Sequence, residues 1–258
     1  MKRLRLDWNR IASVVIAIVV AAFGIPYVWN WWQDRGPWVD PIAHYMLHTG
    51  LMETLRLAAF SVVGGTLIGI VLGTLLTIRF FASRAVIRLY IEVWRGLPIV
   101  VTLFLIYFAF PKAVTLPGGH QLSPTTAAII TLILWGSAQV AEATRGAIQS
   151  IPREQHEASA ALGFGWAGRH AFVILPQAIR RLLPPLVSLL VNIIQNTTVA
   201  SLIGVAEVLE TGNRSVERLV FSTGQPHAFP IFIGVMALFF VISFPLTRLA
   251  SFLERRLI

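Results

Sequence analysis

Cysteine is absent from this 258-residue sequence, and charged residues are scarce. Without cysteine the chain has no disulfide framework and no thiolate metal site. Charged residues make up 13% of the chain and hydrophobic residues 56%, whereas a soluble domain carries about 25% charged residues. This composition argues against an ordinary soluble domain and predicts a protein that crosses a membrane several times.

The motifs of phosphate-binding and hydrolytic sites are absent as well. No lysine follows a glycine, so the sequence has no nucleotide-binding P-loop. His156-Glu157 begins a zinc-protease motif, but Ala160 stands where the second histidine is required. No Gly-x-Ser-x-Gly nucleophile motif occurs either. These absences favour a protein that is not an enzyme, with no catalytic residue, no metal site and no cofactor of its own.

Long apolar segments dominate what is present. A helix needs about 20 apolar residues to cross the hydrocarbon core of a membrane, and six segments are long enough: about 11–31, 52–78, 86–110, 125–148, 182–204 and 229–250. We therefore predict an all-α membrane protein with about six transmembrane helices. Trp29, Trp31 and Trp32 after the first segment are typical of a membrane interface, which favours an uncleaved anchor over a signal peptide.

Basic residues are distributed unequally between the two sets of loops. Of the 21 Lys and Arg residues, Arg35, Arg56, Lys112, Arg214 and Arg218 lie in one set of loops and the other 16 in the alternate set. Because basic residues accumulate on the cytoplasmic side, we expect both termini and the loop around 150–176 to be cytoplasmic. The net charge of +9 is then a topology signal, and nucleic-acid binding is not expected.

Small residues recur every four positions in the second apolar segment, at Ser61, Gly65, Gly69, Gly73 and Thr77. On a helix these positions share one face, where another helix can approach closely. The pattern favours packing within the chain, with a contact between subunits as the alternative.

The segment 150–176 is polar and rich in small residues, unlike the apolar sequence on both sides. Its pattern predicts a helix with Glu157 near its positive end, a stop at Gly163 in a left-handed conformation, a short second helix over about 166–172, and a break at Pro176. A helix with a small-residue face can lie deep in a groove of a partner protein. The alternative is a helix that lies on lipid headgroups.

Polar residues within apolar segments are costly, so each group invites a functional hypothesis. Three Glu and Arg pairs at i, i+3 spacing suggest structural ion pairs: Glu53 and Arg56, Glu92 and Arg95, Glu142 and Arg145. The fifth segment carries a denser cluster: Asn192, Gln195, Asn196, Thr197, Thr198 and Ser201. This path cluster either lines a translocation pathway or forms hydrogen bonds between helices.

The segment 150–176 resembles the EAA loop of ABC-transporter permease subunits, in which Glu-Ala-Ala is followed after three residues by Gly and then by Ile-x-Leu-Pro. The matching positions are Glu157, Ala158, Ser159, Gly163, Val173, Leu175 and Pro176. Ser159 replaces the second alanine and Val173 the isoleucine, and both changes are small. The resemblance implies that Glu157, Ala158, Ser159, Gly163, Leu175 and Pro176 form a coupling helix and its surroundings, which dock on a separate ATPase.

The resemblance extends from about residue 50 to the C-terminus, and over this range the chain is similar to the polar amino-acid subfamily of these permeases. The segments that carry it are WRGLPIVVTLFLIYF (94–108), AEATRGAIQSIPREQHEA (141–158), LPQAIRRLLPPL (175–186), ASLIGVAEVLE (200–210) and FPLTRLASFLERRL (244–257). The family often carries a lysine followed by Asp or Asn where Gln195-Asn196 stands here, so this site does not indicate the charge of a substrate.

The resemblance implies a permease subunit of an ATP-driven importer for polar amino acids. It implies a five-span permease domain over 51–258 with the coupling helix between spans 4 and 5, preceded by an anchor span and an extracytoplasmic loop over 1–50. The expected partners are a cytoplasmic ABC ATPase dimer that holds ATP and Mg²⁺, a second permease subunit (identical or paralogous), an extracytoplasmic solute-binding protein and the lipid bilayer. The expected location is a bacterial cytoplasmic (inner) membrane.

Two other functions stay open at this point. The same machinery could carry another small solute, such as an opine or a quaternary amine. A membrane scaffold or receptor could use the polar loop only for assembly, although the path cluster favours transport.

Overall fold

A computed structural model describes residues 36–77, 81–110 and 122–257 of this chain. It divides into two units, Met1–His44 and Tyr45–Ile258. Most of helix α3 (Val39–Tyr45) belongs to the first unit. The predicted segment 11–31 and its tryptophans lie outside the described residues.

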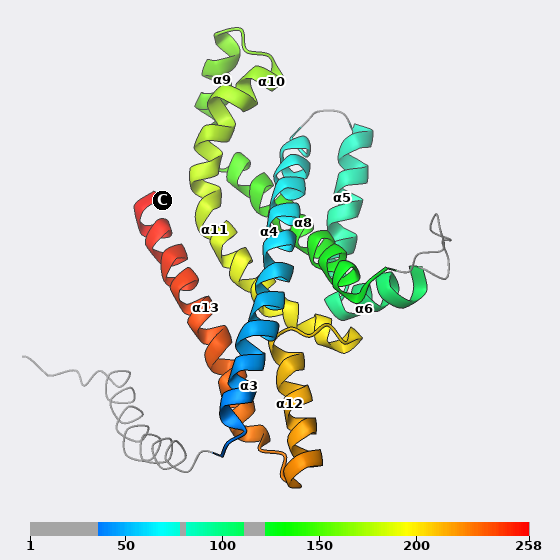
Figure 1. Ribbon diagram of the computed structural model, residues 1–258. Helices are drawn as coiled ribbons and strands as arrows, with labels where there is room; N and C mark the ends of the chain where they lie inside the picture. Colours follow the sequence, from blue (N-terminus) through cyan, green and yellow to red (C-terminus); the bar gives the residue numbers. More distant parts are fainter. Residues whose placement is uncertain (1–35, 78–80, 111–121, 258) are drawn as a thin grey trace, which may run out of the picture. The chain divides into compact units, whose positions relative to one another are not determined.

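The second unit is built from helices, and its described residues contain no strand, as the all-α prediction requires (Figure 1). The helices are α4 (Met52–Leu75), α5 (Phe81–Gly96), α6 (Ile99–Phe104), α8 (Pro124–Gln149), α9 (Arg153–Ala161), α10 (Trp166–Arg169), α11 (Leu175–Asn196), α12 (Val208–Thr223) and α13 (Ala228–Leu257). Wider π-helical turns form η2 (Met46–Leu51), η3 (Leu105–Ala109) and η5 (His170–Ile174), and a tighter 3-10 helix forms η6 (Thr197–Ile203).

Four helical stretches in the described residues are long and apolar enough to cross a membrane: Val39–Leu75, Pro124–Gln149, Trp166–Ile203 and Ala228–Arg256. They contain most of the predicted segments 52–78, 125–148, 182–204 and 229–250. A fifth candidate joins Arg84–Gly96 to Ile99–Ala109 across a bend of 105°. The described residues therefore offer four spans, or five if the bent pair crosses as one.

The bend replaces the continuous helix that the sequence predicts over 86–110, and Pro98 explains it. Proline has no N–H to donate within a helix, and it disfavours the helical conformation of the residue before it. Pro98 itself has a non-helical backbone, with φ −58° and ψ 132°, and caps the start of α6. The chain therefore turns between α5 and α6.

The small-residue face of α4 packs on α8 within the same chain. A Cβ atom added to Gly69 would lie 2.5 Å from Cβ of Val140 and 2.7 Å from the carbonyl oxygen of Ser137, so only glycine fits there. Gly65 and Gly73 approach the backbone of α8 in the same way. The prediction of internal packing is confirmed for these glycines.

The polar loop and the turn before α13 lie at opposite ends of this unit (Figure 1). Helices α9 and α10 lie at the end where α4 stops and α5 begins, while α12 runs toward the other end and meets α13 there.

Candidate functional site

The polar loop folds as the predicted helix–glycine–helix. Helix α9 ends at Ala161, and Gly163 adopts the left-handed conformation with φ +83°. The N–H of Gly163 donates to the carbonyl of Ala160 at 3.0 Å, and the N–H of Phe164 donates to that of Ser159 at 3.2 Å. These bonds satisfy carbonyls at the end of α9. Helix α10 then begins at Trp166.

The residues of the EAA-like motif divide into an exposed and a buried group. Glu157 and Ala158 are exposed, and the Glu157 carboxylate accepts from Nε of Arg153 at 2.7 Å. Ser159 is buried, and its hydroxyl donates to the carbonyl of Gln155 at 2.7 Å. Leu175 is half-buried and Pro176 exposed. The exposed group is therefore the part that a partner could contact.

Exposed apolar side chains extend this surface beyond what the sequence pattern indicates. Leu162 is 77% exposed and Phe172 74%, and Phe164 lies with its ring centroid 6.2 Å from that of Phe172. The small-residue pattern of the sequence did not indicate these three side chains as part of the surface.

The loop is fixed to the helices behind it by two kinds of contact. An apolar cluster joins it to α8 and α11: Ala147, Ile148, Ile151, Ile174, Ala178 and Leu182. The imidazole of His170 lies 2.9 Å from the hydroxyl of Thr77, at the end of α4, and 2.9 Å from the carbonyl of Trp166. The loop is thereby in contact with α8, α11 and the residues that follow α4.

The predicted break at Pro176 is wrong. Helical structure is continuous from Trp166 to Ile203, and Pro176 lies in the first turn of α11. Proline is tolerated in the first turn of an α-helix, and the wider turn η5 replaces the regular α-helical bonds just before it. Pro184 and Pro185, which the sequence places at the start of the fifth span, lie inside α11.

The path cluster lies where α11 changes into η6. Asn192 and Gln195 are exposed, Asn196, Thr198 and Ser201 are half-buried, and Thr197 is buried. The hydroxyl and amide donors bond to the preceding turn of their own helix: Asn196 to Asn192, Thr197 to Ile194, Thr198 to Gln195 and Ser201 to Thr198, at 2.7–2.8 Å. These bonds differ from the bonds between helices that the packing alternative requires.

Two of the three predicted ion pairs form. Glu53 and Arg56 pair on α4, and Glu142 pairs with Arg145 on α8 through a hydrogen bond of 2.9 Å from Nε. Arg95 donates instead to Gln139 on α8, with Nε 3.2 Å from Oε1.

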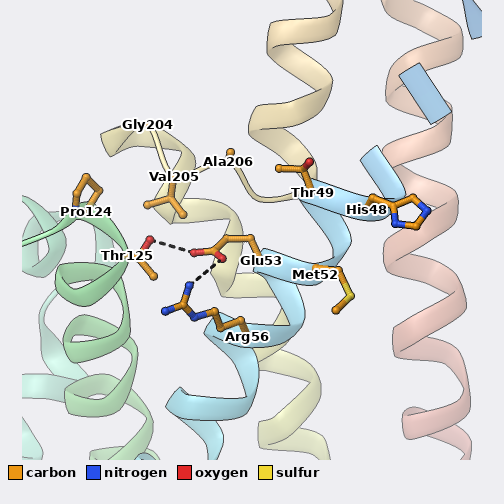
Figure 2. A pocket seen from close by; sticks show the side chains of 10 residues that line it. All are labelled: His48, Thr49, Met52, Glu53, Arg56, Pro124, Thr125, Gly204, Val205 and Ala206. Atoms are coloured by element: carbon orange, nitrogen blue, oxygen red, sulfur yellow. Dashed lines mark hydrogen bonds and ion pairs between the residues drawn. The ribbon is translucent and has the colours of Figure 1, made fainter. Parts of the chain in front are cut away.

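The outer cleft is a cavity of about 580 Å³ beside the start of α4 (Figure 2). It lies between the start of α4, the start of α8 and the turn after η6, and it is lined by His48, Thr49, Met52, Glu53, Arg56, Pro124, Thr125, Gly204, Val205 and Ala206. Figure 2 shows the Glu53 carboxylate between Thr125 and Arg56. The sequence indicated the Glu53 and Arg56 pair but not the cavity around it.

A buried carboxylate near this cleft was also missed by sequence reasoning. Glu207 is fully buried and accepts the backbone N–H groups of Leu209 at 2.9 Å and Glu210 at 2.8 Å, which caps α12. Burial raises the pKa of the Glu207 carboxyl to about 7, although the two N–H bonds act in the opposite direction.

Comparison with known proteins identifies the relatives of this chain. Residues 65–258 match the family described as binding-protein-dependent transport system inner membrane component. The glutamine transport system permease protein GlnP of Escherichia coli (strain K12) is 35% identical over 212 residues, which cover 82% of this chain and 93% of that protein. The probable amino-acid ABC transporter permease protein YckA of Bacillus subtilis (strain 168) is 37% identical over 161 residues, which cover 62% of this chain and 69% of that protein.

Solved structures share the fold. The crystal structure of an amino acid ABC transporter with histidines matches with a TM-score of 0.70 and 30% identity, and the match covers 83% of this chain and 94% of that chain. An inward-facing structure of the MetNI methionine ABC transporter matches with a TM-score of 0.67 and 18% identity over 84% of this chain and 98% of that chain. The second likeness concerns the fold alone.

Proposed function

This chain belongs to the family of binding-protein-dependent transport system inner membrane components, and we propose that it is the permease subunit of an ABC importer for polar amino acids. The similarity to a glutamine permease over 93% of that protein's length is the observation that carries the proposal. The amino acid transporter structure, which is 30% identical, supports the same substrate class.

The polar loop is the proposed docking site for a cytoplasmic ABC ATPase dimer. Glu157, Ala158, Ser159, Gly163, Leu175 and Pro176 belong to it, and exposed Leu162 and Phe172 extend its surface. ATP and Mg²⁺ would bind to the ATPase and not to this chain. Closure of the ATPase dimer would move the loop, and the contacts from His170 to Thr77 and through the apolar cluster would pass that motion to α4, α8 and α11.

The proposed topology has six spans and cytoplasmic termini, in a bacterial inner membrane. Residues 1–50 would form an anchor span with an extracytoplasmic loop, and 51–258 the five-span permease domain in which α5 and α6 cross as one bent span. The opposite positions of the polar loop and the turn before α13 support this arrangement. A second permease subunit and an extracytoplasmic solute-binding protein would complete the transporter.

The path cluster is the proposed lining of the translocation pathway. Its members are Asn192, Gln195, Asn196, Thr197, Thr198 and Ser201, of which Asn192 and Gln195 expose their amide groups. A row of neutral hydrogen-bonding groups suits a polar solute without selecting its charge, and selectivity would then rest largely on the solute-binding protein.

Reconstitution tests the proposed function. The permease, co-expressed with its partner ATPase and solute-binding protein, is placed in proteoliposomes, and uptake of L-glutamine, L-glutamate, L-arginine and L-histidine is measured with and without ATP. We expect ATP-dependent uptake of at least one of these amino acids.

The control substrates are a quaternary amine and an opine, which represent the other small solutes that the sequence leaves open. Uptake of either without uptake of any amino acid would refute the proposed substrate class. Absence of all uptake in an assembled, ATP-hydrolysing complex would refute transport itself.

A further inference from the structure

The outer cleft is not used by the proposed coupling mechanism, although its position suits a transported solute. It is formed by the ends of three elements that are far apart in the sequence. Gly204, in its wall, directly follows η6, which carries Thr198 and Ser201 of the path cluster. Under the proposed topology a solute that comes from outside would meet this cleft before it meets the path cluster.

A carboxylate is held in a fixed position on one side of the cleft. The side chain of Glu53 is only 20% exposed, and Oε1 accepts from the hydroxyl of Thr125 on α8 at 2.9 Å. Because the two residues belong to different helices, this bond fixes the carboxylate relative to both. A carboxylate has several acceptor positions, so Oε2 can accept from a further cation.

A guanidinium lies beside this carboxylate and is only loosely held by it. Nη1 of Arg56 lies 3.6 Å from Oε2 of Glu53, which is longer than the roughly 2.7–2.9 Å of a charge-assisted hydrogen bond. The Arg56 side chain is 61% exposed. Its guanidinium carries five N–H donors in a planar fork that matches a carboxylate, so a ligand can still be bound by two of them.

One fixed anion and one accessible cation, a single helical turn apart, match the two charges of an amino acid. The ammonium and carboxylate of an α-amino acid are attached to the same carbon atom and require opposite charges side by side. We propose that the outer cleft binds the zwitterionic head group of a free α-amino acid, with Glu53 at the α-ammonium and Arg56 at the α-carboxylate. This inference rests on the proposed function, because it takes amino acids as the transported solutes.

The rest of the cleft is compatible with side chains of different kinds. Met52, Pro124 and Val205 supply apolar wall, and Thr49 supplies a hydroxyl. A volume of about 580 Å³ exceeds that of any single amino acid, so the cleft does not enclose such a ligand tightly. Such a site holds its ligand weakly, which suits a position from which the solute must move on.

The competing explanation is an ion pair that serves only to stabilise α4. If the pair only stabilises α4, substitution of either residue should change the affinity for all ligands alike, whichever charged groups they carry. The two explanations therefore differ in how each variant responds to analogues that lack one charge of the head group.

The experiment uses the purified permease–ATPase complex in lipid nanodiscs, without nucleotide or solute-binding protein. Binding is measured by saturation-transfer NMR for three probes: L-glutamine, its α-amide, which lacks the carboxylate, and its N-acetyl derivative, which lacks the ammonium. We expect the wild type to bind L-glutamine roughly tenfold or more tightly than either derivative, because each derivative leaves one charged group without its partner.

Each variant should lose one preference and keep the other. Arg56→Gln should bind L-glutamine and its α-amide equally but still bind the N-acetyl derivative more weakly. Glu53→Gln should bind L-glutamine and its N-acetyl derivative equally but still bind the α-amide more weakly. Arg218→Gln and Glu217→Gln, which change the same charges at exposed positions of α12, should keep both preferences.

Two results of this experiment would overturn the inference. If both variants shift all three probes alike, the pair is structural and the inference is wrong. Absence of binding to the wild type at millimolar L-glutamine would also overturn it. These failures leave the proposed function intact, because amino-acid uptake by the wild-type complex is measured separately.

Discussion

Among single residues, Glu207 offers the clearest link between burial and measurable behaviour. Its carboxyl has a pKa of about 7 in the folded chain, against an ordinary value of 4.5. The folded state therefore binds more protons than the unfolded state between these two pH values. The contribution of this proton to the free energy of unfolding is fully present below pH 4.5. It is lost as pH rises through about 7, at up to about 1.4 kcal/mol per pH unit.

We predict that Glu207→Gln removes this pH dependence. Glutamine keeps a carbonyl that can accept an N–H at the start of α12, but it does not titrate. The melting temperature of the solubilised complex should fall from pH 5 toward pH 7.5 in the wild type, and it should fall less in Glu207→Gln. Glu217→Gln, at an exposed position on the same helix, is the matched control. Parallel curves for wild type and Glu207→Gln would show that this carboxyl does not titrate in the window.

Individual site residues were predictable from sequence where a local pattern sufficed. The left-handed Gly163 and the pair of Glu53 with Arg56 depend on spacing along one segment. The burial of Glu207 and the contact of His170 with Thr77 depend on the approach of distant segments. The outer cleft was not predictable for the same reason, because its three walls are far apart in the sequence.

At the scale of elements, hydropathy located the long helices and failed where proline is involved. α8 and α13 agree with their predicted segments to within a few residues, except that α13 extends to Leu257. Proline bends the chain at Pro98 but is accepted within α11 at Pro184 and Pro185. The difference depends on whether neighbouring packing holds the helix together, which a single sequence does not reveal. Helix α12 was missed because it is amphipathic and too polar for a span.

The coupling element leads to a prediction about Gly163. Its φ of +83° disfavours any side chain, although no atom lies within 4 Å of an added Cβ. Gly163→Ala should therefore cost about 1 kcal/mol through the backbone alone, and the end of α9 would shift. We expect weaker co-purification of the ATPase, or a lower ratio of amino-acid uptake to ATP hydrolysis, with normal insertion in the membrane.

Gly165 is the matched control for this prediction. It lies two residues further on in the same turn, has equally open space around an added Cβ, and has a φ of −65° that any residue adopts. Gly165→Ala should behave as the wild type, and Gly163→Asn should be milder than Gly163→Ala, because asparagine tolerates the left-handed region. Equal behaviour of the two alanine variants would exclude the proposed role of this turn.

For the whole molecule, the unequal distribution of basic residues and the helix arrangement are both consistent with the proposed topology. The positive-inside rule predicts a cytoplasmic polar loop, and α9 and α10 lie at the opposite end from the turn between α12 and α13 (Figure 1). Helix α8 begins beside the start of α4, where the Thr125 hydroxyl donates to Glu53, so the two helices start on the same side of the membrane.

Cysteine labelling tests the proposed topology. Because the sequence has no native cysteine, each introduced thiol is the only one in this chain. We predict that an impermeant maleimide labels Gln225→Cys in intact spheroplasts but labels Ala167→Cys only after permeabilisation; both positions are exposed. Thr126→Cys, exposed in the first turn of α8, should also be labelled from outside. Labelling of Thr126→Cys only after permeabilisation would place the starts of α4 and α8 in the cytoplasm and would refute the proposed topology. Labelling of Ala167→Cys from outside would place the polar loop on the wrong side for a cytoplasmic ATPase, and the coupling role would then be wrong.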